Sequence, residues 1–226
     1  MGGAFETGLT NRVPVELAYR VRAEGRSADE ILMYLKAMGT EYVAINGAKS
    51  KEYYRDFRRP DRLTSLPVVY QADDDVVYSL PARPLANLVN EGELPDDDVL
   101  ERTEYLRKYV AAHEDGTRPA LNVSWQNVSR LLISGSVRPG DLVAVQVNAA
   151  DGWKATQDGR EVPLTADRLG FLVVHPSPAP QTMIDLTFYG TTEQRVMAGV
   201  SAIAWIAAIA GWIRVRRHAS DAAPLP

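Results

Sequence analysis

Residues 196–213 read VMAGVSAIAWIAAIAGWI and contain no charged side chain. As a helix this stretch would rise about 27 Å, close to the roughly 30 Å hydrocarbon thickness of a bilayer. The run is apolar on all sides, whereas a core helix, the alternative, is typically apolar on one face. The sequence therefore predicts a C-terminal transmembrane helix. An interfacial aromatic and four arginines flank it or lie near its ends: Trp212, Arg195, Arg214, Arg216 and Arg217.

Charge predicts the orientation of this helix. Three of the arginines follow it, and positive charge marks the cytoplasmic flank of a span. We therefore expect a single-pass protein with residues 214–226 as a cytoplasmic tail and the preceding residues outside the cytoplasm. The first residues, MGGAFETGLTNRVPVELAY, lack the basic and apolar regions of a signal peptide. The chain is accordingly expected to be the C-terminal part of a larger membrane protein, either a fragment or one half of a split protein.

Composition excludes few classes of function. Lys and Arg number 25 against 29 Asp and Glu, a net charge of −4, so nothing indicates a nucleic-acid partner. The chain has no cysteine, which excludes a disulfide framework and a thiolate metal site. A hydrophobic content of 46% is ordinary for a packed domain that also carries a span.

Residues 1–117 are predicted to form a small N-terminal part built from helices and strands. Ser27 and Glu30 give the capping-box pattern for a helix near residues 27–38, and the strand EYVAIN follows. PVVYQ and VVYSL flank Asp73–Asp75 and predict a hairpin, and LANLV is a third strand. A second helix near residues 97–113 is expected to be an exposed connector, with apolar contacts from Val99, Leu100, Tyr105, Leu106 and Val110.

Residues 118–190 change to the pattern of short strands. Seven segments rich in Val, Leu and Thr alternate with turn residues: LNVSW, SRLLISGSV, DLVAVQVNA, WKATQ, REVPL, GFLVVH and TMIDLTFYG. Asp158-Gly159 is a hairpin signal. The expected fold class is α+β, with a small helix and strand N-terminal part, an antiparallel, jelly-roll-like β-sandwich and one C-terminal transmembrane helix over residues 196–213.

The segment 152–163, GWKATQDGREVP, resembles a strand–turn–strand near the C-terminus of the bacterial YfhO-like integral membrane proteins. IDLTFY at 184–189 resembles the stretch that precedes the terminal membrane helix of that family. LKAMGTEYVAIN and VVYQADDDVVYSLP resemble its region further upstream. The resemblance spans most of residues 28–213. The family is similar to polyprenol-phosphate-dependent sugar transferases of the GT-C type.

This resemblance implies a bacterial cell-membrane location and a role in glycosyl transfer or cell-envelope polymer modification. In GT-C enzymes the catalytic acidic residues lie in an external loop between early spans, which this sequence lacks. No catalytic residue is therefore carried over. The expected function is that of a membrane-anchored extracytoplasmic domain, non-catalytic alone, that assists a transferase. Two alternatives stay open: the acceptor-sugar-binding part of a GT-C glycosyltransferase, and an anchored scaffold or adhesion module.

Trp153 and Trp125 are candidate glycan contacts, because an indole ring can stack on a sugar. Asp158, in the same predicted hairpin as Trp153, is the third candidate. The alternative for each tryptophan is a core anchor, and for Asp158 the chemistry of a turn. A basic, aromatic stretch supplies candidate lipid-headgroup contacts, with a solvated helix face as the alternative: Lys49, Lys51, Arg55, Arg58 and Arg59.

Metal and cofactor motifs are not apparent. Asp73–Asp75 and Asp96–Asp98 could ligate calcium, but a hairpin turn and a helix N-terminus explain them without an ion. His113, His175 and His218 lack zinc spacing, and no nucleotide loop or nucleophile elbow occurs. We therefore expect no metal and no cofactor.

The expected partners follow from the span. They are the lipid bilayer and other membrane helices of a larger or split protein, together with a lipid-linked sugar or envelope glycan. Small residues four apart, such as Ala198 with Ala202 and Ala207 with Gly211, would allow close helix packing.

Overall fold

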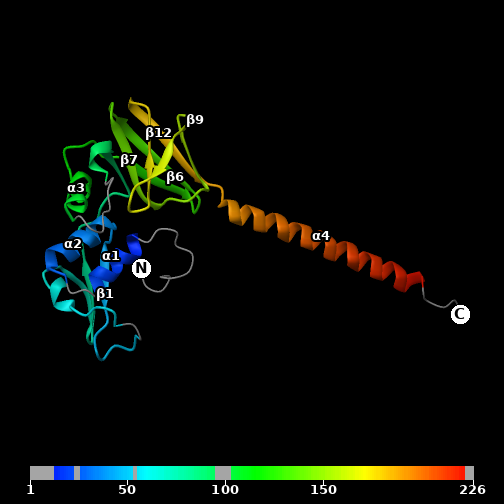
Figure 1. The fold of residues 1–226 in the computed structure, drawn as a ribbon, viewed down its shortest axis with the longest axis horizontal. Helices are drawn as coiled ribbons and strands as arrows, with labels where there is room; N and C mark the ends of the chain where they lie inside the picture. The colour runs from blue at the N-terminus through cyan, green and yellow to red at the C-terminus, as the bar shows by residue number, and fades with distance from the viewer. Residues whose placement is uncertain (1–12, 23–25, 53–54, 95–102, 222–226) are drawn as a thin grey trace. The chain divides into compact units, whose positions relative to one another are not determined.

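The structure is a computed structural model that describes residues 13–22, 26–52, 55–94 and 103–221 (Figure 1). Four α-helices and three antiparallel sheets make up the described chain, which confirms the α+β class. The chain divides into two compact units. One comprises residues 1–149 and 154–187, and the other comprises residues 150–153 and 188–226.

Two helices open the first unit. The sequence reading missed α1 (Val13–Arg22), which buries Leu17 and Val21. Helix α2 (Ala28–Ala37) begins after Ser27, whose side chain accepts a hydrogen bond from the backbone N–H of Glu30. The Glu30 carboxylate accepts one from the Ser27 N–H in return, so the capping box satisfies both groups.

Sheet A has the strand order β1-β3-β2, formed by Tyr42–Ile45, Asp75–Ser79 and Val68–Ala72. Strands β2 and β3 form the expected hairpin, and Asp73 in its turn adopts a positive φ of 53°. A short 3-10 helix, η1 (Pro60–Leu63), lies between β1 and β2 in the sequence. Val43 and Tyr78, which pair across β1 and β3, are buried in the core below the helices.

Helix α3 (Thr103–His113) corrects one expectation. The predicted apolar contacts of Leu106 and Val110 are confirmed, but the helix is not an exposed connector, because Tyr109 is fully buried with them in the core. The residues that start the expected helix, including Val99 and Leu100, lie outside the described residues. The core against which α3 packs joins the helices to sheet A and to β11, and its largest fully buried members are Leu17, Ile31, Tyr34, Leu63, Leu106, Tyr109 and Leu169.

Sheet B has the order β10-β11-β7-β4, formed by Leu164–Ala166, Phe171–Val174, Asp141–Asn148 and Ala86–Asn90. Strand β4, the predicted LANLV strand, precedes residue 118 yet pairs along its whole length with β7. Helix α3 packs on this sheet, because Ala112 clusters with Val89 of β4 and Ala144 of β7. A second 3-10 helix, η2 (Glu91–Glu93), follows β4 directly.

Sheet C has the order β5-β6-β12-β8-β9, formed by Asn122–Asn127, Arg130–Val137, Ala179–Phe188, Trp153–Gln157 and Arg160–Val162. Strands β6 and β12 of sheet C bury alternate residues, among them Leu131, Ile133, Ile184 and Leu186. Sheet B is buried on both faces, because β11 is buried at all four residues and β7 at Val143, Ala144 and Val145. Helix α3 covers one of these faces, and the other carries Val143, Val145, Leu172 and Val174, as in two sheets packed face to face.

Pro163 divides one predicted strand into two. REVPL was expected to be a single strand, but β9 ends at Val162 in sheet C and β10 begins at Leu164 in sheet B. Proline has no N–H to donate to a ladder, so the chain can leave one sheet at this residue. The Pro163 carbonyl still accepts a 3.0 Å hydrogen bond from the His175 N–H.

Candidate functional site

Helix α4 (Thr192–Asp221) contains the apolar run that dominates the sequence. Among the described residues it is the one helix long and apolar enough to cross a membrane, over Thr192–Arg214, and none of that segment is buried within the protein. Ile203, Trp205 and Ile206 are exposed to 69%, 70% and 68%. A contiguous apolar surface of this kind marks a site of contact with lipid or protein.

The flanking residues expected from the sequence lie at the two ends of this segment. Arg195 stands in the first turn of α4, where its guanidinium donates to the Thr192 hydroxyl over 3.2 Å. Trp212 is 57% exposed near the other end, and Arg214 is exposed. The backbone of Arg216 and Arg217 continues the helix, and their side chains are not among those that the structure describes.

The start of α4 is capped from two directions, a feature that the sequence reading missed. The Thr191 hydroxyl accepts from the Gln194 N–H over 3.2 Å, and the Gln194 side chain accepts from the Thr191 N–H over 3.1 Å. Asp151 adds a third bond, in which Oδ2 accepts from the Thr192 N–H over 3.0 Å. Hydrogen bonds from Thr192 hold the pKa of Asp151 below its usual value. The Thr-x-x-Gln spacing is a capping-box signal in the sequence. Asp151 is too far from Thr192 in the sequence for its role as a helix cap to be predicted.

The turn at Ala150–Trp153 lies against the residues that lead into α4. The Tyr189 N–H donates to the Gly152 carbonyl over 2.9 Å. A Cβ on Gly152 would lie 2.5 Å from the Gly190 oxygen, closer than a real side chain allows. Glycine is therefore required at position 152 by the close approach of two backbones.

The three candidate glycan residues are not brought together. Trp153 is half-buried, and its ring packs against Phe188 with centroids 5.3 Å apart and the ring planes tilted by 47°. Asp158 lies beyond the other end of β8, where it accepts from the Thr182 hydroxyl over 2.9 Å and from the Met183 N–H over 3.1 Å. Trp125 is 48% exposed on β5, which two strands separate from β8. The observed contacts of Trp153 and Asp158 are those of packing and of a turn.

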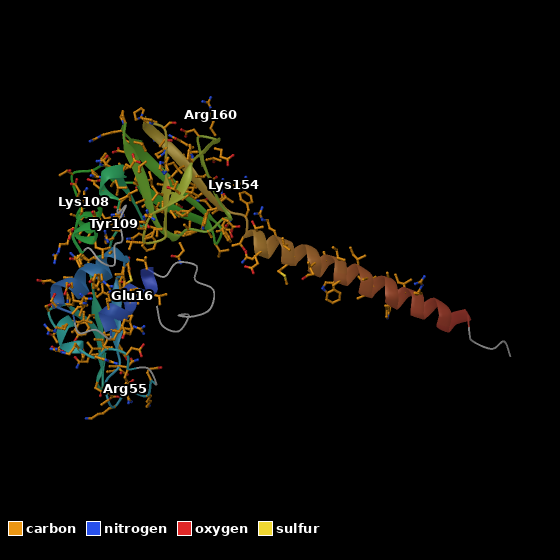
Figure 2. All side chains as sticks on the ribbon, in the orientation of Figure 1. Glu16, Arg55, Lys108, Tyr109, Lys154 and Arg160 are labelled. Atoms are coloured by element: carbon orange, nitrogen blue, oxygen red, sulfur yellow. The ribbon has the colours of Figure 1, made fainter. Side chains whose placement is uncertain are left out.

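The candidate lipid-headgroup residues lie on an irregular loop, not on the solvated helix face that was the alternative. Arg55 is labelled in Figure 2. Its guanidinium donates hydrogen bonds to the Gly47 and Ser50 carbonyls and so links two parts of the same loop. Arg59 pairs with Asp61 through two hydrogen bonds, which hold the pKa of Asp61 below its usual value. Three exposed cations remain for which no ion pair is found within the described residues: Lys49, Lys51 and Arg58.

The acidic turn holds this loop in place. Asp74 accepts from the Lys49 N–H over 2.5 Å, and Asp75 accepts from the Ser50 hydroxyl over 2.9 Å and the Gly47 N–H over 3.3 Å. The carboxylates of this turn therefore accept hydrogen bonds from backbone N–H groups and from a hydroxyl. Asp96–Asp98 lie outside the described residues. Within those residues, no group of three or more histidines and carboxylates is placed to hold a metal ion.

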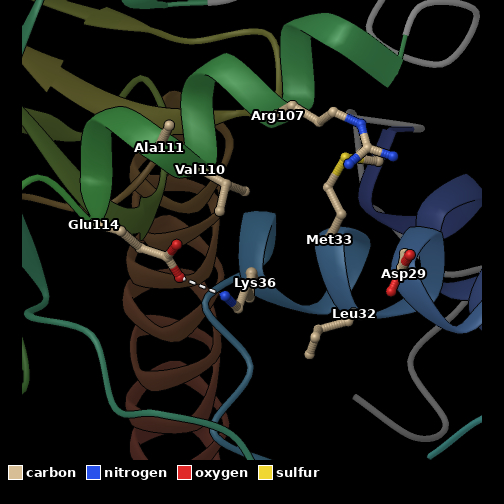
Figure 3. Close-up of a pocket in the computed structure, with 8 residues that line it drawn as sticks. All are labelled: Asp29, Leu32, Met33, Lys36, Arg107, Val110, Ala111 and Glu114. Carbon is tan, nitrogen blue, oxygen red and sulfur yellow. Dashed lines mark ion pairs between the residues drawn. The ribbon is translucent and has the colours of Figure 1, made fainter.

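A groove of about 320 Å³ runs between α2 and α3 (Figure 3). Its floor is apolar, with Leu32, Met33 and Val110, and its rim is charged. Lys36 and Glu114 form a 2.8 Å ion pair across one part of the rim. No sequence pattern indicated the groove, because its two walls are separated by more than sixty positions in the chain.

A polar cluster lies beside this groove in the core. The Tyr109 hydroxyl donates to Asp167, and burial raises the pKa of Asp167 to about 6. The His113 ring packs against Tyr109 at a tilt of 42°, and burial lowers the pKa of His113 to about 4. Arg83 donates to the Lys36 carbonyl, and burial lowers the pKa of this guanidinium. The sequence reading missed the cluster because its members come from three separate segments.

Comparisons with protein-family models, with curated proteins and with solved structures found no match to this chain.

Proposed function

We propose that this chain is the membrane-anchored, extracytoplasmic domain of a YfhO-like protein, and that it assists glycosyl transfer or envelope-polymer modification without catalysing it. The observation that carries the proposal is α4, whose candidate span exposes apolar side chains on all sides. Such a helix is stable in lipid, where every backbone polar group is satisfied within the helix.

The orientation in this proposal rests on charge. Arg214, Arg216 and Arg217 follow the span within four residues, and the cytoplasmic flank of a span carries the excess of Lys and Arg. The sandwich then lies on the opposite side of a bacterial cell membrane. Three residues separate the end of β12 at Phe188 from the start of α4 at Thr192. Because three residues reach about 10 Å at most, a domain tethered in this way works near the bilayer surface.

The contacts that the candidate glycan residues make favour a non-catalytic role. Trp153 packs on Phe188, and both carboxylate oxygens of Asp158 accept hydrogen bonds from β12. Tyr109, Asp167 and His113, whose pKa values are shifted chiefly by burial, lie in the core. These contacts favour an accessory domain over an acceptor-sugar site, and the resemblance to YfhO-like proteins supplies the link to glycosyl transfer.

Cysteine accessibility tests the anchor and its direction. The natural chain has no cysteine, so Ser177→Cys on the sandwich and Ser220→Cys after the span each give a single thiol. In intact cells a membrane-impermeant thiol reagent should label the first variant and spare the second. The reverse labelling would contradict the topology, and a chain that stays soluble without detergent would contradict the span.

A transfer assay tests the accessory role. The purified chain alone should leave a polyprenyl-phosphate-linked sugar unchanged, whereas membranes that lack it should transfer the sugar more slowly than membranes that contain it. Turnover by the purified chain would show that it is an enzyme, and equal rates in both membranes would favour a scaffold or adhesion module.

A further inference from the structure

The chain contains a single asparagine that is followed by glycine. Asn46 and Gly47 come directly after β1, and every other asparagine is followed by a residue that carries a Cβ. An asparagine side chain loses ammonia when the backbone nitrogen of the next residue attacks its Cγ and closes a five-membered ring. Glycine favours this attack, because it has no Cβ in the way and its backbone is the least restricted. The pair Asn46-Gly47 is therefore the asparagine position most prone to the reaction.

Aspartates that precede glycine can close the same ring, but in this chain they are bound. Each of the three accepts hydrogen bonds from a threonine in its charged form: Asp115, Asp151 and Asp158. A carboxylate must be protonated before its oxygen can leave, and these bonds favour the charged state. The amide of Asn46 has no such requirement, so it is the better candidate for ring closure.

The backbone nitrogen that would attack is held by the β2–β3 hairpin. The Gly47 N–H donates to Asp75 Oδ1 over 3.3 Å, and the same carboxylate accepts from the Ser50 hydroxyl over 2.9 Å. The Gly47 carbonyl accepts from Arg55 Nε over 2.9 Å. A Cβ on Gly47 would lie 2.5 Å from the Asp74 backbone oxygen, so two backbones are in close contact here. These contacts restrict the movement of the Gly47 backbone.

The carboxylates beside Gly47 also act on its nitrogen through their charge. The attack requires the N–H to lose its proton, so the reacting nitrogen carries negative charge. Asp75 binds the protonated N–H and, together with Asp74, repels the negative form. Geometry and charge therefore both slow the reaction while the loop is closed, and both effects are relieved when it opens.

We propose that Asn46 is a site of slow, spontaneous deamidation, and that the conversion releases residues 46–52 from the β2–β3 hairpin. In the first step the Gly47 nitrogen bonds to Asn46 Cγ, its proton passes to a base in the solvent, and the Cγ–Nδ2 bond breaks. Nδ2 takes a proton from water and leaves as ammonia. Water then opens the ring at either carbonyl, which gives aspartate or isoaspartate at position 46. Water is consumed and ammonia is released, with no change in oxidation state.

Either product places a new carboxylate beside an acidic turn. It stands next to the residue whose N–H binds Asp75, so like charges repel across the contact that closes the loop. Isoaspartate also adds a methylene to the backbone where Gly47 packs against Asp74. The loop, with its exposed Lys49 and Lys51, should therefore open more often in the converted chain.

Ageing of the full chain in detergent at neutral pH tests the site. Peptide mapping by mass spectrometry follows Asn46 and, as the control in the same sample, Asn148, an exposed asparagine followed by alanine. Isoaspartate should accumulate at Asn46 and not at Asn148. Asp75→Ala should raise the rate at Asn46 about five-fold, because it removes the hydrogen bond to the attacking N–H. Ser50→Ala removes only the second bond to Asp75 and should raise the rate less. Circular-dichroism melting checks that both variants are folded.

Limited trypsin digestion tests the consequence of the conversion. Asn46→Asp carries the charge of the product from the start, and should be cut after Lys49 and Lys51 about two- to five-fold faster than the fresh parent. The aged parent should approach this rate. Asn46→Gln is the control, because glutamine would have to close a larger ring, and its cleavage rate should not change as the chain ages.

Three results would overturn the proposal. Asn46 that stays intact in the folded parent and in Asp75→Ala, while it converts in the urea-unfolded chain, would show that the native loop blocks the reaction. Slower conversion in Asp75→Ala would show that Asp75 promotes the attack. Equal cleavage of Asn46→Asp and the fresh parent would show that the new charge leaves the loop closed. None of these results bears on the membrane anchor, which cysteine labelling tests separately.

Discussion

The hydroxyl of Tyr109 on α3 donates a 2.9 Å hydrogen bond to Oδ2 of Asp167, which lies 58 residues further along the chain. Asp167 Oδ1 accepts a second bond from the Phe171 N–H over 2.8 Å. These bonds favour the carboxylate, but burial outweighs them and raises the pKa of Asp167 to about 6 from its ordinary 3.8. The pair therefore links α3 to the loop before β11. Because the charged form of Asp167 is disfavoured by burial, the stability of this link depends on pH.

The pH dependence of Asp167 has a definite sign. Because its pKa is higher in the folded chain than in the unfolded chain, its contribution to stability is complete below about pH 3.8 and is lost as pH rises through about 6. Asp167→Asn stays uncharged and should gain on the order of 2–3 kcal/mol relative to the parent across this interval. Urea unfolding of the detergent-solubilised chain at a series of pH values measures the difference, and parallel curves would contradict it.

For His113, the dependence of folding stability on pH should have the opposite sign. Burial lowers its pKa to about 4 from 6.5, and the neighbouring Arg83 charge adds to this effect. Its contribution to stability is present above about pH 6.5 and is lost as pH falls toward 4. We expect His113→Gln to unfold less readily than the parent as acid is added, in the same unfolding series. A variant whose stability falls with the parent curve down to pH 4 would show that His113 does not titrate in this way.

Gly152 should not tolerate a methyl group. A Cβ there would meet the Gly190 oxygen at 2.5 Å, and neither backbone can move without loss of the Tyr189–Gly152 hydrogen bond. Gly152→Ala is therefore expected to destabilise this junction by about 1–3 kcal/mol, measured as a lower melting temperature in detergent. Gly116→Ala is the matched control, because a Cβ at Gly116 has no heavy atom within 4 Å. Equal melting temperatures of the two variants would show that the backbones at Gly152 and Gly190 are not tightly packed.

Trp153 is expected to be chiefly structural. Its half-buried ring packs against Phe188, and its truncation to Ala should cost about 2–3 kcal/mol, less than the loss of a fully buried tryptophan. Circular-dichroism melting reads this loss, with the half-exposed Trp125→Ala as the control that should melt almost like the parent. If Trp153→Ala melts normally but no longer binds an envelope glycan, the acceptor-sugar alternative gains.

Asp75 should hold in place the loop that carries Lys49 and Lys51. Its carboxylate accepts from the Ser50 hydroxyl and the Gly47 N–H, so Asp75→Ala leaves both donors without this partner. Trypsin should then cut after Lys49 and Lys51 about five-fold faster, as expected for about 1 kcal/mol less local stability. Asp73→Asn, in the same turn, is the control, since asparagine tolerates the positive φ at that position. Unchanged cleavage in Asp75→Ala would show that Asp74 alone holds the loop.

Sequence by itself was sufficient where the signal is local. The uncharged run at 196–213 predicts α4, Ser27 and Glu30 predict the start of α2, and Asp158-Gly159 predicts the β8–β9 hairpin, each from residues a few positions apart. Helical rise, capping and turn chemistry are properties of short segments, so no knowledge of the rest of the chain is needed.

Only the tertiary structure decided which distant segments meet. Nothing near Ala86 indicates that β4 joins β7, nothing in REVPL shows that the chain changes sheets at Pro163, and nothing around Tyr109 points to Asp167. The sequence predicts the apolar contacts of Leu106 and Val110 on α3, but not the burial of Tyr109, because the surface that covers this residue comes from distant segments. Burial and strand partners depend on the competition among all apolar surfaces of the chain, and that competition is resolved only when the whole domain packs.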